Sequence, residues 1–371
     1  MNKFYLLFFA FLFLSLFNGK AQTTSTYSTA ATYTWTCPTG VTSVTVECFG
    51  AGGCGSARTN SGQNAGGGGG AYASSVIAVT AGTNYTVVVG AGGTSGGTNN
   101  GGNSTFNTNV VVAAGGTGLA NGVAVGGAGG LASASTGTIK FNGGTGGAPG
   151  GGTSGGGGGG AGSSGVGGAG NIPSVGTGGA GATDNIDGSG GTGVSGNSVG
   201  GSGNGYGGGG AGGSRSTSGS RNGGNGADGA VLITYVCPVV AGGSYTVGGA
   251  SPNYATLTAA FAAINCGGLA GDVNLVLQTG YTSASETFPI ATPTNTGTYS
   301  VTVYPGVSGL SITSANTAET INFDGSDNII FDGRVNQAGA LDLIIENTST
   351  GGVAIQFIDD ATYNTIKYCT V

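Results

Sequence analysis

The sequence has no histidine and few charged residues. Without histidine, Ser-His-Asp and Cys-His nucleophile systems and the commonest metal ligand are excluded. Only 8 basic and 14 acidic residues occur among 371, and no charged side chain lies between Arg58 and Lys140. An acidic chain with so few lysines and arginines is not expected to bind nucleic acid or anionic lipid. The uncharged stretch must be kept in solution by Ser, Thr, Asn and bare peptide groups.

Proline is also scarce, whereas glycine is abundant. The chain has 87 glycines but only 8 prolines and no strict Gly-X-Y period, which excludes collagen. No Gly-Lys-Ser/Thr sequence exists for a P-loop, and Gly-x-Gly-x-x-Gly matches carry no information at this density of glycine. No Cys-x-x-Cys pair is present to hold zinc. We therefore expect no cofactor, no metal and no enzymatic activity.

Residues 1–22 have the pattern of a cleavable export signal. Lys3 precedes an unbroken apolar run over residues 4–17, and a short polar segment with Lys20 follows it. A transmembrane anchor is the less favoured alternative, because the run is shorter than the roughly 20 residues that span a bilayer. We expect cleavage near Ala21 or Gln22, a secreted or outer-surface location, and no membrane span in the mature chain.

Six cysteines fit an oxidising compartment. They are Cys37, Cys48, Cys54, Cys237, Cys266 and Cys369. The sequence leaves their pairing open, but Cys37 and Cys237 share a context, each standing before a proline at one end of the glycine-rich half. This symmetry predicts a disulfide between Cys37 and Cys237. In the alternative interpretation, Cys266 and Cys369 are free and buried.

Residues 23–236 alternate short β patterns with glycine blocks. A period of two, bounded by Gly or Asn-Gly turns, predicts β-strands. These strands are expected at 41–49, 73–80, 85–89 and 230–235. A flexible Gly/Ser linker is the alternative, but linkers do not usually begin and end with amphipathic strands. We expect one glycine-rich β domain over 23–236.

This segment resembles the glycine-rich domain of phage tail adhesins and many bacterial surface proteins. The likeness covers residues 33–236, and the segments 33–46, 85–90 and 223–235 carry it together with the glycines. The resemblance implies a β-sandwich whose glycine tracts stack as polyglycine II helices, an extended threefold conformation like polyproline II. Glycine allows such stacking because it keeps its N–H and has no Cβ, although ordering it costs much backbone entropy.

Composition changes at Cys237-Pro238, so we expect a second domain over 237–371. Leu257, Phe261 and Ile264 are four and three residues apart and predict an amphipathic helix within 252–265. It is the only convincing helix of the mature chain. Strands are expected at 273–277, 299–304, 320–323, 328–331, 341–345, 353–358 and 365–371.

The C-terminal strands contain a faint repeat, in which 327–331 is echoed by 363–368. Three short strands followed by a return to the same Asn-x-Ile motif predict a parallel β-helix, with a small sandwich as the alternative. The segments 243–249, 254–261 and 272–277 resemble the opening of pectin-lyase-like right-handed β-helices of Bacteroidetes-type secreted proteins. That resemblance implies a helix and first strands that cap the coil. About one and a half coils are visible, so the chain is expected to be a fragment.

Aspartates are the best candidates for chemistry. Asp324, Asp327, Asp332, Asp359 and Asp360 could hydrolyse a glycoside if two of them met in a groove. Several stand beside glycine, however, where Asp favours turns because it bonds its own backbone. We therefore interpret these residues, and Asp228 in a sequence that imitates a calcium-binding repeat, as turn residues.

The sequence as a whole predicts an all-β structural or adhesive protein that binds extracellular glycans or host and cell surfaces. Trp35, Tyr72 and Tyr206 are candidate glycan contacts, although core packing is the favoured use of Trp35. One alternative is a polysaccharide-active β-helix lyase or glycoside hydrolase whose catalytic coils lie beyond residue 371. A further alternative is ice binding by flat polyglycine faces.

Overall fold

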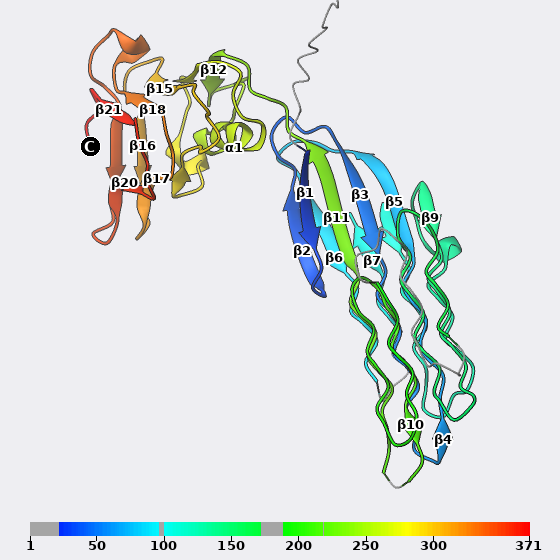
Figure 1. Cartoon of the computed structure of the whole chain (residues 1–371). Helices are drawn as coiled ribbons and strands as arrows, with labels where there is room; N and C mark the ends of the chain where they lie inside the picture. Colours follow the sequence, from blue (N-terminus) through cyan, green and yellow to red (C-terminus); the bar gives the residue numbers. More distant parts are fainter. Residues whose placement is uncertain (1–21, 96–99, 172–187, 218) are drawn as a thin grey trace, which may run out of the picture.

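The computed structural model describes residues 22–95, 100–171, 188–217 and 219–371. Within these ranges the chain is mostly β-strand, with one α-helix. The predicted export signal, residues 1–22, lies outside the described residues except for Gln22. Antiparallel sheets form the N-terminal region, and parallel sheets form the C-terminal region that follows Val236. The two regions therefore differ in architecture (Figure 1).

The largest N-terminal sheet has five antiparallel strands. In spatial order they are β1 (Gln22–Tyr27), β11 (Ala230–Val236), β3 (Ser43–Phe49), β5 (Tyr72–Ala78) and β9 (Ile139–Phe141). Alternation decides which face is buried: Val44 and Val46 point into the core, whereas Ser43 and Thr45 are exposed. The predicted strands at 41–49, 73–80 and 230–235 are confirmed within one or two residues at most ends.

A second antiparallel sheet shares its core with the first. Its strands are β2 (Ala31–Thr36), β6 (Asn84–Val89), β7 (Ser104–Phe106) and β8 (Val111–Ala113). Val46 and Ile233 of the first sheet and Val87 and Phe106 of the second are fully buried in one cluster. Each such side chain contributes about 1.5–3 kcal/mol on burial. This shared core orders the ends of the strands from which the glycine segments leave.

The glycine segments are held by backbone hydrogen bonds rather than by side chains. Gly67 N–H donates to the Gly210 carbonyl, Gly158 N–H to the Gly67 carbonyl, and Gly209 N–H to the Gly158 carbonyl, at 2.8–2.9 Å. Each of the three extended segments is therefore hydrogen-bonded to the other two. In a flat sheet this is impossible, because the two outer strands of any three do not touch. A Cβ on Gly158 would overlap the carbonyl group of Gly144, so only glycine permits this approach.

These segments run side by side away from the two sheets (Figure 1). At their far end lies a short antiparallel pair, β4 (Gly62–Gln63) and β10 (Ser214–Arg215). Arg58 helps to close this tip, since its guanidinium donates to the Asn64 side chain at 2.8 Å and to the Ser61 carbonyl at 2.9 Å. Glycine predominates in the rest of the bundle, where backbone hydrogen bonds rather than charged side chains hold the segments together.

Three parallel sheets form the C-terminal region. The first contains β12 (Gly243–Val247), β13 (Val273–Leu277), β15 (Val301–Pro305), β18 (Ile329–Asp332) and β21 (Thr365–Lys367). The second contains β14 (Ile290–Ala291), β17 (Glu319–Asp324) and β20 (Val353–Ile358), and the third contains β16 (Ser311–Ser314) and β19 (Ile344–Asn347). From β15 onward the chain visits the first, third and second sheets in that order and then repeats the visit.

Equivalent side chains stack in columns between successive visits. The register aligns Ile290, Ile321 and Ile355 in the second sheet. Beside them the rings of Phe323 and Phe357 stack with centroids 4.4 Å apart. All seven predicted C-terminal strands are found, although the strand expected at 341–345 is β19, which begins at Ile344, and the one expected to reach 371 ends at Lys367.

The predicted helix is α1 (Leu257–Gly267). The described chain also contains three short 3₁₀ turns, at 132–134, 283–285 and 335–337. The helix α1 begins five residues later than predicted, because the Thr256 hydroxyl accepts the Ala259 N–H and caps the first turn. The Glu286 carboxylate also accepts the N–H groups of Leu257 and Thr258, at 2.7 and 2.9 Å. A negative charge at a helix N-terminus is stabilising. The helix buries Leu257, Phe261 and Ile264.

Candidate functional site

The aromatic residues predicted to contact a glycan are mostly buried. Trp35 is only 4% exposed, and its ring lies 5.7–6.2 Å from those of Tyr85, Phe106 and Tyr235. Its favoured interpretation as a core residue is confirmed. Tyr72 is 1% exposed, and its hydroxyl donates to Glu47 at 2.7 Å, so its prediction as a glycan contact is wrong.

Tyr206 is the third of these candidates. It is half-buried, and its ring packs 5.2 Å from that of Phe49. Phe49 in turn lies edge-on to Tyr72, with ring centroids 5.1 Å apart. The structure therefore places Tyr206 in a small aromatic cluster between the five-stranded sheet and the glycine segments. Trp35 and Tyr72 lie in strands, where alternation alone does not say which face is buried, whereas Tyr206 lies in a turn and has no such pattern.

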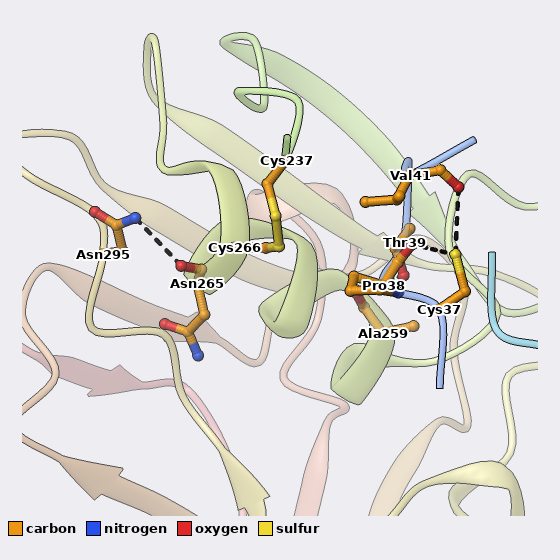
Figure 2. Close-up of a disulfide and its surroundings, with 9 residues drawn as sticks. All are labelled: Cys37, Pro38, Thr39, Val41, Cys237, Ala259, Asn265, Cys266 and Asn295. Atoms are coloured by element: carbon orange, nitrogen blue, oxygen red, sulfur yellow. Dashed lines mark hydrogen bonds between the residues drawn. A yellow bond between two sulfur atoms is a disulfide. The ribbon is translucent and has the colours of Figure 1, made fainter. Parts of the chain in front are cut away.

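The disulfide joins Cys237 to Cys266, not to Cys37 (Figure 2). The predicted bridge between Cys37 and Cys237 is therefore wrong, as is the alternative that Cys266 is free. The helix α1 brings Cys266 beside the end of β11, with the two Cα atoms 5.4 Å apart, a normal disulfide spacing. Cys37 is free and buried, and its thiol donates to the Val41 carbonyl at 3.4 Å. Cys369 is free, as in the alternative interpretation, but its side chain is half-buried rather than buried.

The C-terminal carboxylates fall into separate sites rather than one groove. Asp332 is fully buried and accepts hydrogen bonds from Arg334 Nε at 3.0 Å and Nη2 at 2.7 Å, while Lys367 Nζ lies 3.3 Å away. Hydrogen bonding from Arg334 is the main reason that the pKa of Asp332 is lowered. The Arg334 guanidinium also stacks 4.2 Å above the ring of Tyr368. This arrangement clamps β18 to β21.

Of the other aspartates, Asp324, Asp359 and Asp360 are exposed and Asp327 is half-buried. The hydrogen bond between the Asp324 and Asp359 side chains is the main reason that the pKa of Asp324 is raised. Asp327 accepts the N–H of Thr362 at 2.7 Å, and its bonds to Thr362 lower its pKa. Asp360 lies in the turn after β20 and is exposed. Glycoside hydrolysis requires two carboxylates that face the same glycosidic bond. Among these described aspartates, only the side chains of Asp324 and Asp359 contact each other.

Asp228 joins segments that are far apart in the sequence. Its carboxylate accepts the N–H of Gly92 at 2.8 Å and that of Ala30 at 3.1 Å. Both carboxylate oxygens of Asp228 thus accept hydrogen bonds from backbone N–H groups.

No group of three or more His, Cys, Asp or Glu side chains that could hold a metal ion is found in the described ranges.

An uncharged hollow lies on the outer face of the five-stranded sheet. Its volume is about 350 Å³, and Ser43, Thr45, Val76 and Thr234 form its floor, with Gln22 at one side. The hydroxyl groups of Thr24 and Thr234 lie 3.0 Å apart on the same face. The strand register continues this row from Thr234 to Thr45. Among the described residues, no acidic or basic side chain lines the hollow, so it suits a neutral, polar ligand surface. We call it the threonine groove.

Sequence reasoning missed the threonine groove, although the signal was present. Period-two alternation already places Ser43 and Thr45 on the face opposite to Val44 and Val46. The other residues of that face, Gln22 and Thr234, lie on β1 and β11, which are about two hundred residues apart in the sequence. Only the pairing of β11 with both β1 and β3 brings them beside Ser43 and Thr45.

In the part of the chain that the structure describes, no helix is long and apolar enough to cross a membrane.

Comparison with known proteins gives one match. A family model described as a glycine-rich domain matches residues 27–236. No curated protein matches the sequence significantly. The matched segment begins at the last residue of β1 and ends with β11, so it includes the other strands of both antiparallel sheets, the glycine bundle and most of the threonine groove, whose Gln22 and Pro238 lie outside it. Since this match covers more than half of the 371 residues, the chain belongs to the glycine-rich domain family.

Proposed function

We propose that this chain is an exported structural or adhesive protein of the outer cell surface or the extracellular medium, and that it is not an enzyme. The single observation that supports this most is the glycine bundle, whose segments are joined to one another by backbone hydrogen bonds. The described segments of the bundle consist mainly of glycine, and the bundle is rigid because each of them is hydrogen-bonded to several others. It serves best as a platform or spacer.

The finer architecture of this proposal has two parts. The N-terminal region is a β-sandwich whose glycine tracts form polyglycine II layers, supported by the mutual bonding of Gly67, Gly158 and Gly209. The C-terminal region is the capped beginning of a right-handed parallel β-helix. The repeated visit to three parallel sheets and the columns of Ile and Phe side chains support this part.

The proposed partners are extracellular glycans or host and cell surfaces. The threonine groove offers hydroxyl and amide groups without charge, and neutral hydrogen-bonding groups match the hydroxyl-rich surface of a glycan. The chain is acidic, with a net charge of −6 before the predicted signal is removed. Nucleic acids and anionic membranes are therefore disfavoured as partners.

Binding of the mature chain to an array of glycans and to whole cells tests this proposal. We expect retention on at least one glycan or cell type, without release of new reducing ends from polysaccharide. Thr45→Asp should weaken retention, because it places a charge on the floor of the groove. Thr26→Asp is the matched control, since Thr26 is exposed on β1 outside the groove. Absence of retention on every surface contradicts adhesion, and release of reducing ends contradicts the non-enzymatic role.

A further inference from the structure

A second, larger hollow lies at the C-terminal end of α1. Its volume is about 780 Å³, which is in the range of small-molecule sites. One wall is the segment 267–270, which follows the disulfide-bonded Cys266, and the other is the turn 295–299. Val239 completes the lining. We call this hollow the helix-end hollow.

Hydrogen bonds brace the two walls against each other. The Asn265 side chain accepts the N–H of Thr294 at 2.8 Å, and the Asn265 carbonyl accepts Nδ2 of Asn295 at 3.2 Å (Figure 2). Gly268 ends the helix with φ +70°, and its carbonyl accepts the Val240 N–H at 3.0 Å. The walls are therefore positioned by the chain itself, so a ligand would not have to order them.

The disulfide fixes the first wall from behind. Cys266 is the last residue but one of α1, and its bond to Cys237 ties the helix end to the strand end of the N-terminal region. Gly297, with φ +61°, turns the second wall back, and the Tyr299 N–H donates to the Thr296 carbonyl at 3.2 Å. Thr298 and Tyr299 of this turn line the hollow.

The helix-end hollow is lined by an exposed aromatic residue, which the threonine groove lacks. Tyr299 is 38% exposed, whereas Tyr235, the aromatic residue of the threonine groove, is 9% exposed with its ring packed against Trp35. In the described part of the chain, no side-chain hydrogen bond involves the hydroxyl groups of Thr298 or Tyr299 or the Oδ1 atom of Asn295. These groups are available to a ligand.

The chemistry of the lining selects one class of ligand. In the part of the chain that the structure describes, no acidic or basic side chain lines the helix-end hollow, so a charged ligand would lose hydration without gaining a counter-charge. An apolar ligand would leave the amide and hydroxyl groups unpaired. A sugar ring has an apolar face that stacks on an aromatic ring and hydroxyl groups at its edge, and thus satisfies both kinds of surface.

We propose that the helix-end hollow is a binding subsite for a neutral saccharide, with Tyr299 as the stacking platform and Asn295 and Thr298 as hydrogen-bonding partners. This inference rests on the proposed adhesive function and names the place and the ligand class. It also gives the Cys237–Cys266 bridge a role, because the bridge fixes one wall of the subsite.

Isothermal titration of the mature chain with cellohexaose, mannohexaose and tetragalacturonate tests the subsite. We expect binding of at least one neutral hexasaccharide and at least tenfold weaker binding of the acidic tetrasaccharide. Tyr299→Ala should weaken neutral binding at least tenfold, and Tyr299→Phe should keep it within about threefold because the ring remains. Tyr363→Ala, which removes an 83% exposed tyrosine outside the hollow, is the matched control and should bind like the wild type.

Three outcomes overturn the subsite: no binding of either neutral probe, equal binding of the acidic probe, or equal losses in Tyr299→Ala and Tyr363→Ala. Retention of Tyr299→Ala on cells separates this inference from the proposed function. If the wild type adheres and Tyr299→Ala adheres equally well without a change in saccharide affinity, adhesion stands and the subsite fails. If the wild type adheres to nothing, the proposed function itself fails.

Discussion

The glycine-rich region and the C-terminal region both stack extended backbone, but different atoms hold the stacks together. In the glycine bundle the contacts are between peptide groups, as at Gly158, whose N–H and carbonyl bond to two other segments. In the parallel sheets, peptide groups bond within each sheet while side chains such as Ile321 and Phe323 fill the space between sheets. Glycine segments, which lack side chains, can thus form backbone hydrogen bonds in several directions. Segments with large side chains form backbone hydrogen bonds only within a sheet, and their side chains build a hydrophobic core between the sheets.

The largest expected effect comes from adding one methyl group to the bundle. Gly158→Ala places a Cβ on the carbonyl of Gly144, so segments must separate and lose backbone hydrogen bonds. We expect the free energy of unfolding of the N-terminal region to fall by about 4 kcal/mol or more, from overpacking and unpaired peptide groups. Urea denaturation followed by far-UV circular dichroism measures it.

Gly351→Ala is the control for that change. Gly351 lies in an exposed turn of the C-terminal region, and a Cβ there would only touch Thr317 at 3.9 Å. Its effect should stay within about 0.5 kcal/mol. Equal stability of Gly158→Ala and Gly351→Ala would show that the bundle does not depend on close backbone approach.

The next effect concerns the link between the two regions. Cys266→Ser removes the bridge to Cys237 and should lower the free energy of unfolding of the C-terminal region by about 3 kcal/mol, because the open chain gains conformational entropy. Cys37→Ser should change it by less than about 1 kcal/mol, since a serine hydroxyl can still donate to the Val41 carbonyl. Peptide mapping without reduction provides a direct check. A peptide pair containing Cys37 and Cys237 would refute the assignment.

The smallest expected effect is a pH dependence confined to the C-terminal region. The pKa of Asp332 is lowered in the folded chain, chiefly by Arg334. Its ionised form therefore contributes stability above the unfolded pKa of about 3.9, and this contribution is lost as the pH falls through the lowered folded value. Asp332→Asn should reduce the loss of stability on acidification from neutral pH to about pH 3.

Urea midpoints at the two pH values measure this difference. Asp360→Asn is the control with the same change of charge, because Asp360 lies in an exposed turn and makes no ion pair in the described chain. We expect Asp360→Asn to follow the wild type. An unchanged acid response in Asp332→Asn would mean that the clamp between β18 and β21 does not depend on this charge.

Local patterns predicted most of the elements, since local physics sets them. The alternation over 41–49 and 230–235 is sufficient for strands, and the spacing of Leu257, Phe261 and Ile264 is sufficient for a helix. Short strands without clear alternation escaped prediction, among them β14 and β16. Their sequences are ordinary, and their pairing with β17 and β19 makes them strands.

The candidate sites were predicted less well. The role of Tyr72 and the partner of Cys237 depend on contacts between residues far apart in the chain. A shared Cys-Pro context suggested that Cys37 bonds Cys237, but the path of α1 places Cys266 there instead. The threonine groove and the helix-end hollow each combine segments from distant parts of the sequence, and no local pattern carries that information.

By itself, the sequence determined that this protein has no histidine chemistry, that its N-terminal half is dominated by glycine, and that strands frame that half. These properties follow from composition and from periodicity over a few residues. The tertiary structure alone decided which glycine segments touch, which cysteines bond and which aromatic residue, Tyr299, stays exposed at a hollow. Such choices depend on packing between distant segments, because burial and hydrogen-bond partners exist only once the chain has folded.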